Sequence, residues 1–573
     1  RSLFLSNSLS LRRRHKFLPN NGCAMLRIPG SLFVIAIAAI LGLSPCSVAC
    51  EVPEAKPDTL VVCPLPFQQA MVKWCGYREQ QGHVIKMVEP PASVEALKRT
   101  IRQVAKSGSL KHVLIVGDVR GPRGLNNVAV PTDFVEAKVG VLFGSDPEIA
   151  TDNPYADLNS DGLPDLSIGR IPLDTVAEIE NYIARIIKYE SPSQKQQWQR
   201  RINFVAGVGG FGSVIDGLIE QTTKTIITDL VPSEYETSMT YGSWCSPFCP
   251  DPRRFSEVAI SRFNEGCLFW VYIGHGNRTA LDRVRMPDRS HLILDNQTVS
   301  KLNCIEGSPI ALFLACYTGA MDHPVDCLAE TMLRQDGGPI AAICGSRVTM
   351  PYAMSLLSLE MVHEYFHGKV ETLGELTLLS KRRMVKGSAN NPKYREMIEG
   401  MGKTFSPAPQ LLDLERLEHA QLIQLIGDPL LRLKRPESLE LQVNPVAVVG
   451  DQLQVTGVSP EAGDLMIELA YPRDRFRERP RRRVKYDPSN ESLEEYQRTY
   501  EKTHDLVWVS KTISIGAGPF AATLSIPADI RGRCIVRGML QTADRLAIGS
   551  VPIEVSKVKL SRQADLLKPE LRK

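Results

Sequence analysis

Short apolar runs alternate with amphipathic stretches through the first third of the chain. Residues 60–62, 83–88 and 112–116 are rich in aliphatic side chains, as buried strands are. Helical spacing of apolar residues predicts helices between and after them, over 67–81, 94–106 and 175–189. This alternation is typical of a parallel sheet with helices on both faces. We therefore expect a first α/β subdomain over residues 58–195.

A second unit with the same alternation follows over residues 200–435. Its strand candidates are apolar almost throughout and cover 202–208, 267–273, 309–315 and 339–343. Helices are expected near 214–229, 254–265, 325–335 and 352–367. The fold class predicted for residues 58–435 is thus α/β, with two consecutive parallel-sheet subdomains.

The pattern changes after residue 436. Short β-type runs recur with turn residues between them, which predicts a β-sandwich of immunoglobulin-like size over 438–556, followed by a tail at 557–573. The segment 472–502 interrupts these strands with clustered arginines and then acidic residues. We expect it to be a solvated loop whose two halves neutralise each other, the alternative being a basic site for a polyanion or the cell surface.

The first 49 residues form an N-terminal extension with an export signal. Arg27 precedes the apolar run 32–43, and the small residues 47–49 follow it, which is the order of a cleavable secretory signal. Met25 just before the basic residue predicts the true start of translation. Cys50, directly after the cleavage site, allows the alternative of a lipid anchor. No later segment reaches the ~20 apolar residues of a membrane span, so we expect a secreted or cell-envelope protein.

Charge excludes one class of partner. The formal net charge is +4, but the first 49 residues contain six basic side chains and no acidic one. Without them, 62 Lys and Arg stand against 64 Asp and Glu, a balance of −2. A near-neutral mature chain gives no support to nucleic-acid binding.

Two buried strands end in residues with catalytic chemistry. The first is followed by His275 and Gly276, and the second by Cys316. The spacing of 41 residues (316 − 275) allows one strand–helix–strand excursion back to the same sheet edge, which places imidazole and thiol side by side. Such a pair performs nucleophilic acyl transfer, with the backbone N–H groups of Gly276 and Cys316 as the oxyanion hole. A buried cysteine that merely caps a strand is the alternative, but it leaves the matching His-Gly strand unexplained.

Further motifs make the resemblance specific. Strand-His-Gly followed by strand-Ala-Cys resembles the signature shared by caspases, legumains and gingipains. The gingipain-like group is singled out by additional segments of residues 58–434: LIVGD (114–118), Pro131-Thr132, YADLN (155–159), PDLSIGR (164–170), GPIAA (338–342) and LIGDPL (425–430).

This resemblance to a gingipain-like cysteine peptidase implies a two-subdomain catalytic unit, the second caspase-like, and a following immunoglobulin-like domain. It implies endopeptidase activity on protein or peptide substrates, with His275 and Cys316 as the catalytic pair. Asp216 lies in a region where some members have an acid that orients the histidine. Gingipains proper cleave after Arg or Lys through an acidic pocket residue, and no residue of this chain matches it, so a basic P1 residue is only weakly favoured. The loop 345–352 is expected to line the substrate cleft.

An Asx-rich loop predicts a metal site. Four oxygen-bearing residues stand at positions 1, 3, 5 and 9 of a loop with glycine at position 6, namely Asp157, Asn159, Asp161 and Asp165. Hard cations such as calcium prefer this ligand set. Position 12 is Ile168 instead of the glutamate of an EF-hand, so the expected site is a structural calcium loop of another kind. A turn that satisfies its own backbone is the alternative.

Two other functions compete with the cysteine peptidase. His363, Glu364 and His367 match the H-E-x-x-H pattern of zinc peptidases, although no downstream ligand is evident. A catalytically silent peptidase fold that serves as a surface or binding protein is the second rival. No cofactor is required for the thiol chemistry itself.

Overall fold

The computed structural model describes residues 56–120, 128–192, 196–210 and 213–557 of the 573-residue chain. Within helix α5, side chains at 213–216 and 218–219 are not described. The predicted export signal, the start at Met25, the anchor at Cys50 and most of the tail lie outside the described residues.

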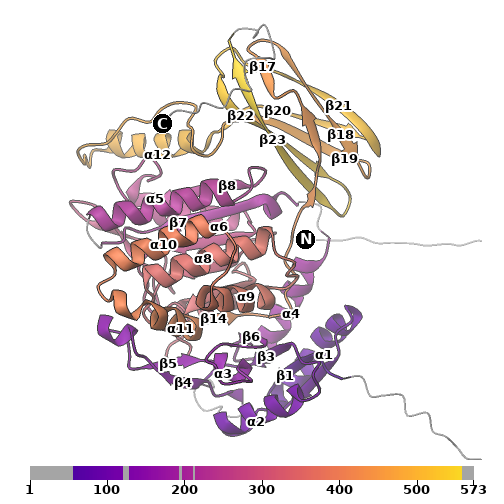
Figure 1. The fold of residues 1–573 in the computed structure, drawn as a ribbon, viewed down its shortest axis with the longest axis vertical. Coiled ribbons are helices and arrows are strands. Elements are labelled where there is room, and N and C mark those ends of the chain that lie inside the picture. The colour runs from indigo at the N-terminus through magenta and orange to yellow at the C-terminus, as the bar shows by residue number, and fades with distance from the viewer. Residues whose placement is uncertain (1–55, 121–127, 193–195, 211–212, 558–573) are drawn as a thin grey trace, which may run out of the picture. The chain divides into compact units, whose positions relative to one another are not determined.

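A ten-stranded sheet runs through residues 59–426 (Figure 1). In spatial order its strands are β2 (Ile85–Val88), β1 (Thr59–Val62), β3 (His112–Val116), β6 (Ser167–Ile171), β14 (Ile423–Ile426), β13 (Ala341–Gly345), β12 (Ile310–Leu314), β9 (Phe269–Ile273), β7 (Arg201–Ala206) and β8 (Glu236–Tyr241). The two-stranded ribbons β4–β5 (Asp133–Glu136, Glu148–Thr151) and β10–β11 (Arg283–Arg285, Ser290–Leu292) lie outside it.

The prediction of two separate parallel sheets is wrong, because β14 joins them. It pairs parallel with β6 and antiparallel with β13, so the two halves of the sheet run in opposite directions. The sequence concealed this strand because a four-residue run directly after a helix, Ile-Gln-Leu-Ile, cannot be told from a further helical turn. The two halves therefore present their carboxyl ends at opposite edges.

Helices cover both faces of the sheet. They are α1 (Leu65–Gln80), α2 (Val94–Ala105), α3 (Asn153–Ala156), α4 (Val176–Glu190), α5 (Ser213–Leu230), α6 (Phe255–Asn264), α7 (Leu328–Arg334), α8 (Pro351–Phe366), α9 (Leu373–Lys386), α10 (Pro392–Phe405) and α11 (Leu412–Leu422). Strand β3 shows the two faces by alternation: Leu114 and Val116 belong to the core that includes α1 and α4, whereas Val113 and Ile115 belong to the core with α2. The expected α/β architecture with a largely parallel sheet is confirmed.

The C-terminal region contains two facing sheets. The larger has the order β15 (Glu437–Ser438), β23 (Leu546–Ser556), β22 (Gly532–Gln541), β19 (Gly463–Ala470) and β20 (Val507–Ile515), with β17 (Val446–Val448) on β23. The smaller is β16 (Leu441–Val443), β18 (Gln452–Ser459) and β21 (Gly518–Ser525). Buried side chains of both sheets, among them Val455 and Val536, form one hydrophobic core.

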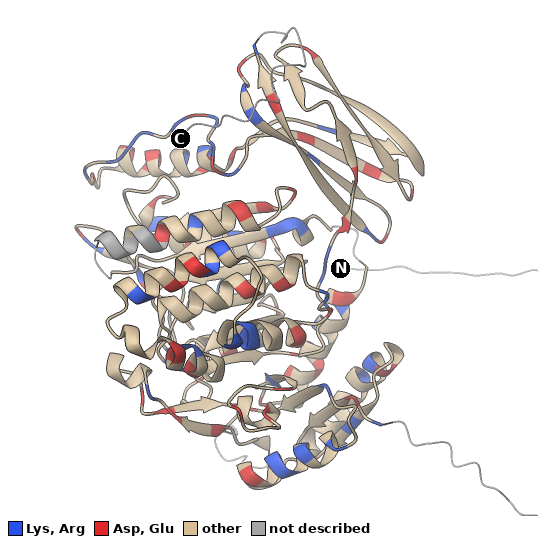
Figure 2. Ribbon diagram, in the orientation of Figure 1, with Lys and Arg blue, Asp and Glu red and all other residues tan. Residues whose placement is uncertain are grey.

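The insertion 472–502 is not a solvated loop. It contains most of helix α12 (Asn490–His504), which carries acidic and basic side chains along its length (Figure 2). Its apolar face is buried: the Tyr500 hydroxyl lies 2.9 Å from Thr240 of β8, and His504 Nε2 accepts the Met239 N–H at 3.0 Å. Charge clustering concealed a helix whose aromatic residues at 496 and 500 pack against the α/β region.

Candidate active site

His275 and Cys316 lie beyond the carboxyl ends of two adjacent parallel strands. Strands β9 and β12 pair with Ile273 opposite Leu314, and each predicted catalytic residue stands two positions further on. All four side chains line the same cavity. The structure thus brings the predicted imidazole and thiol to the same edge and the same face of the sheet.

Several contacts hold the His275 loop. The His275 carbonyl accepts the Tyr272 hydroxyl at 2.8 Å and the Asp282 N–H at 3.0 Å. The imidazole Nε2 lies within hydrogen-bond distance of the Gly209 carbonyl oxygen, beyond the end of β7. A carbonyl only accepts, so this contact places a proton on Nε2 and leaves Nδ1 as the basic nitrogen of the neutral ring.

Cys316 is half-buried and touches one residue of the next loop. The Thr349 N–H donates to its sulfur at 3.3 Å, and the Thr349 hydroxyl oxygen lies 3.6 Å away. Two neighbouring thiols are fully buried, and burial raises the pKa of Cys327 and that of Cys344. Of these three cysteines, Cys316 lines the cavity, and its thiol therefore has the access that a nucleophile needs.

The backbone turns sharply at the nucleophile. Tyr317 has a φ of 59°, in the left-handed region that residues other than glycine rarely occupy. Gly276 packs against this turn so closely that a Cβ there would lie 2.9 Å from the Cys316 carbonyl oxygen. The glycine after His275 is therefore required by space, and the amides predicted to form the oxyanion hole lie in two abutting strand ends.

A polar bridge from the first subdomain supports this turn, and no sequence motif predicts it. The guanidinium of Arg278 lies 4.4 Å from the ring centre of Tyr317 and 2.6 Å from the Asp146 carboxylate. The Asp146 N–H donates to the Tyr317 hydroxyl at 3.1 Å. These residues follow no catalytic pattern, and only the position of Tyr317 directly after the cysteine could have drawn attention to one of them.

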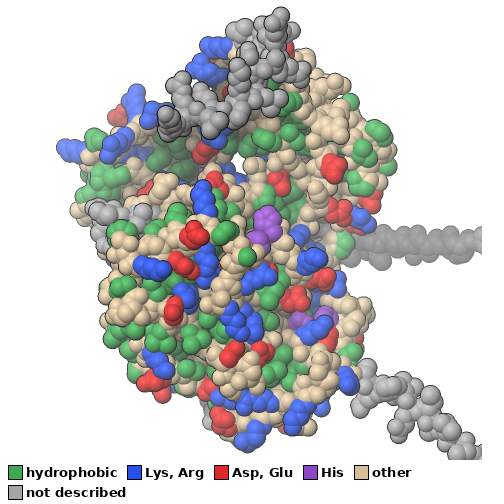
Figure 3. Space-filling model, viewed as in Figure 1, with side chains coloured by type: hydrophobic (Ala, Val, Ile, Leu, Met, Phe, Trp, Pro, Cys, Tyr) green, Lys and Arg blue, Asp and Glu red, His purple; other side chains and the backbone are tan. Residues whose placement is uncertain are grey.

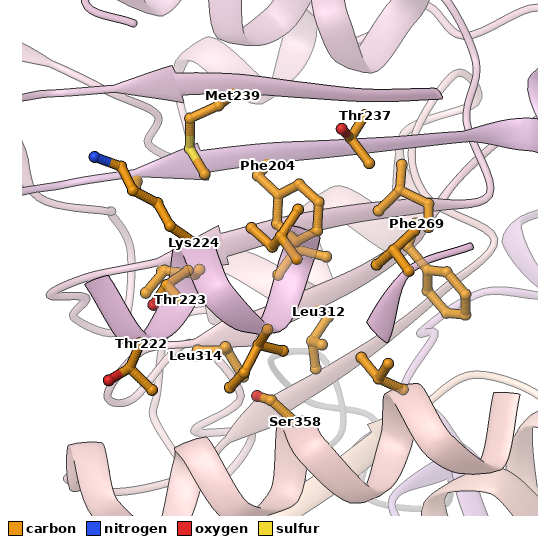
Figure 4. A pocket seen from close by; sticks show the side chains of 18 of the residues that line it. Phe204, Thr222, Thr223, Lys224, Thr237, Met239, Phe269, Leu312, Leu314 and Ser358 are labelled. Carbon is orange, nitrogen blue, oxygen red and sulfur yellow. The ribbon is translucent and has the colours of Figure 1, made fainter. Parts of the chain in front are cut away.

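The cavity beside the pair has a volume of about 330 Å³. It lies between the face of strands β7, β9 and β12 and the helices α5 and α8. Figure 4 shows Leu312 and Leu314 opposite Ser358 of α8, with Phe204 and Phe269 on the same wall. Thr349, Met350 and Pro351 also line it, which agrees with the prediction that loop 345–352 borders the cleft.

Asp216, the predicted orienting acid, falls in α5. Its side chain belongs to the part of that helix whose side chains are not described, so its role stays a prediction.

The predicted calcium loop is held by internal contacts. The Asp157 carboxylate accepts the N–H groups of Ser160 and Gly162, and Asp165 accepts that of Leu158. Two cations approach the remaining oxygens: Arg382 lies 2.8 Å from Asp165, and Lys386 lies 3.1 Å from Asp161. Asn159 accepts the Asp161 N–H at 2.9 Å. Across the described ranges no group of three or more His, Cys, Asp and Glu side chains could hold a metal ion. These backbone contacts are also those of an Asx turn, and the calcium ion stays a prediction.

The H-E-x-x-H segment forms the last turn of α8. Glu364 is 1% exposed and pairs with Arg383, so its carboxylate is not available to activate a water molecule. The rings of His363 and His367 lie 5.4 Å apart, and the cavity lining does not include either of them. This arrangement does not favour a zinc peptidase.

The surface is electrostatically mixed. Basic and acidic side chains are interspersed over the face in Figure 3. Within residues 56–557, apart from the undescribed gaps, no helix is both long and apolar enough to cross a bilayer.

Comparison with known proteins identifies the family. The family model for peptidase family C25 matches residues 52–434. Lys-gingipain of Porphyromonas gingivalis is 21% identical over 286 residues, which are 48% of this chain and 15% of that protein. A solved protease structure covers 87% of this chain and 98% of its own at 13% identity, with a TM-score of 0.50. The Arg-specific cysteine proteinase gingipain R covers 88% and 99% at 15% identity, with a TM-score of 0.49. The structural likeness concerns the fold, and the chain spans only 15% of the length of the curated relative.

Proposed function

This chain belongs to peptidase family C25, the gingipain family that its motifs predict, and we propose that it is a cysteine endopeptidase with Cys316 as nucleophile and His275 as proton carrier. The placement of both side chains on one face at adjacent strand ends is the observation that supports this proposal most strongly. The natural substrates are proposed to be proteins or peptides outside the cytoplasm.

The proposed reaction is acyl transfer in two steps. His275 accepts the Cys316 thiol proton, and the sulfur attacks the carbonyl carbon of the scissile peptide bond. The imidazolium then gives that proton to the leaving amine as the C–N bond breaks, leaving a thioester on Cys316. Water attacks the thioester, loses a proton to His275, and releases the acid and the free thiol. The N–H groups of Gly276 and Cys316 donate to the oxyanion in both steps.

The Gly209 carbonyl supports the histidine's role. By accepting a hydrogen bond from Nε2–H, it orients the ring and fixes the tautomer in which Nδ1 is the basic nitrogen, which is the positioning task that an acidic residue performs in other dyads.

The test is cleavage of a peptide library by the wild type, Cys316→Ala, His275→Ala and Cys245→Ser. Cys245 is an exposed thiol, so its substitution controls for nonspecific sulfur chemistry. We expect the first two variants to lose at least about 1,000-fold in kcat/KM and Cys245→Ser to match the wild type. A folded wild type that cleaves nothing and leaves Cys316 unlabelled by peptidyl thiol reagents would favour the silent scaffold. Activity that persists in Cys316→Ala but stops with a zinc chelator would favour His363, Glu364 and His367.

The finer features of the prediction stay part of this proposal. We assign the paired C-terminal sheets to an immunoglobulin-like domain on the strength of the shared core and the gingipain resemblance. A structural calcium ion at residues 157–165 is proposed only as an accessory to folding, with no part in the reaction.

A further inference from the structure

We propose that the cavity beside Cys316 receives the P1 side chain of the substrate and selects large apolar residues such as Leu, Met and Phe. This proposal rests on the proposed function and names its substrate class. It departs from the weak expectation of a basic P1 residue.

The cavity lies where the P1 side chain of a bound substrate must enter. Cys316 attacks the carbonyl carbon of the P1 residue, and the P1 side chain branches from the neighbouring carbon. That side chain must therefore lie within a few bonds of the sulfur. Leu314 ends β12 two residues before Cys316, Leu312 stands two residues earlier in the same strand, and both side chains line the cavity. A side chain that enters beside the thiol meets this wall first.

The chemistry of the walls is apolar. The sheet face contributes Phe204, Phe269 and Val271 besides the two leucines, and helix α8 contributes methionines. An engineered cavity of ~150 Å³ with such a lining binds benzene, so about 330 Å³ accommodates an aromatic side chain.

The charged groups at the cavity do not suit a basic side chain. Among the described lining residues the one carboxylate is Glu220, which pairs with Lys224 on the same helix. Figure 4 shows the Lys224 amino group directed away from the apolar walls. Arg473 is fixed by three backbone carbonyls, those of residues 231, 232 and 235. A lysine or arginine at P1 would lose its hydration without gaining an ionic partner among the described lining residues, which is costly.

Ser355 offers a direct test. It lines the cavity from α8, and its hydroxyl donates to the Pro351 carbonyl at 2.7 Å, a bond that the helix does not require. Ser355→Asp places a carboxylate on the apolar wall, whereas Ser355→Phe fills the space. Ser300 is exposed and makes the same kind of bond to a backbone carbonyl, so the same two substitutions there are matched controls.

The assay compares kcat/KM for peptides that differ only at P1, with active sites counted by a peptidyl thiol reagent. The wild type is expected to prefer Phe or Leu over Arg by about 100-fold. Ser355→Asp should shift the Arg-to-Phe ratio toward Arg by at least about tenfold. Ser355→Phe should weaken cleavage after Phe but spare Ala. The Ser300 variants should keep the wild-type ratios.

Three outcomes overturn the proposal. Preference for Arg or Lys, lost in Cys316→Ala, would refute the apolar pocket and leave the peptidase function standing. Equal effects of both Ser355 variants on all substrates would show that the cavity does not contact P1. If nothing is cleaved and Cys316 is not labelled, the pocket and the proposed function fail together.

Discussion

His419 gives the most detailed prediction, because it supports the loop beside the nucleophile. The side chain is 1% exposed, and its Nε2 accepts the Met350 N–H at 2.7 Å. Its Nδ1 donates to the Glu415 carbonyl at 2.7 Å. His419→Phe keeps the ring volume but removes the acceptor, so the partly buried Met350 N–H loses this partner. His419→Gln returns an acceptor oxygen near the position of Nε2.

The expected losses of stability and of rate follow from these contacts. An unpaired buried N–H costs about 1–3 kcal/mol of unfolding free energy. Met350 follows Thr349, which touches the Cys316 sulfur, and a displacement of about 1 Å at a reacting group costs up to about 100-fold in rate. We expect His419→Phe to lose both stability and kcat, and His419→Gln to recover most of each.

Low pH should also reduce the stability of the fold through His419. Burial lowers the pKa of His419 to about 4 from its ordinary 6.5, so the unfolded chain binds this proton more readily than the folded chain. Stability from the neutral ring is complete above pH 6.5, falls as the pH is lowered, and is lost by about pH 4. The difference corresponds to about 3 kcal/mol. His419→Phe should therefore show a shallower decline across this range.

Urea titration followed by tryptophan fluorescence, repeated between pH 7 and 4, measures the stability, and peptide hydrolysis measures kcat. A His419→Phe enzyme as stable and active as the wild type would refute the reasoning. So would a His419→Gln variant that behaves like His419→Phe.

Three other predictions concern residues outside the cleft. Asp428→Asn should lower the unfolding free energy by about 3–5 kcal/mol in urea titrations, because it leaves the buried Arg78 guanidinium, 2.6 Å away, without its full counter-charge; unchanged stability would contradict this. Tyr500→Phe removes the contact with Thr240 and should cost about 1 kcal/mol, and a double-mutant cycle with Thr240→Val should show that the two effects are not additive. If the Asx loop binds calcium, titration calorimetry of the wild type will detect binding, and Asp161→Asn will weaken it at least about tenfold. If calcium added to the wild type releases no heat of binding, the loop is a simple turn.

The sequence predicted those parts of the fold that depend on local pattern. Strands β9 and β12 are continuous apolar runs, and the residues after them, His275 and Cys316, stand out against that background. Strand β14 was missed because its identity depends on pairing with residues far away in the chain. The Thr349 contact with Cys316 depends on the path of a loop, which no periodicity encodes.

Helix α12 was concealed for a different reason. Its charges dominate the composition, while the tyrosines that hold it are few and spaced to suit a partner surface. The sequence therefore described the solvent face of this helix correctly and gave no account of its buried face.

The contact between α12 and β8 has a consequence for solubility. Strand β8 is the last of the ten strands, and an exposed terminal strand presents backbone groups to which another chain can add. Here the Met239 N–H is already taken by a side chain, His504, that cannot continue the ladder. Helix α12 thus acts as a guard against chain-to-chain strand addition, supplied by the C-terminal region to a sheet of which it is not a member.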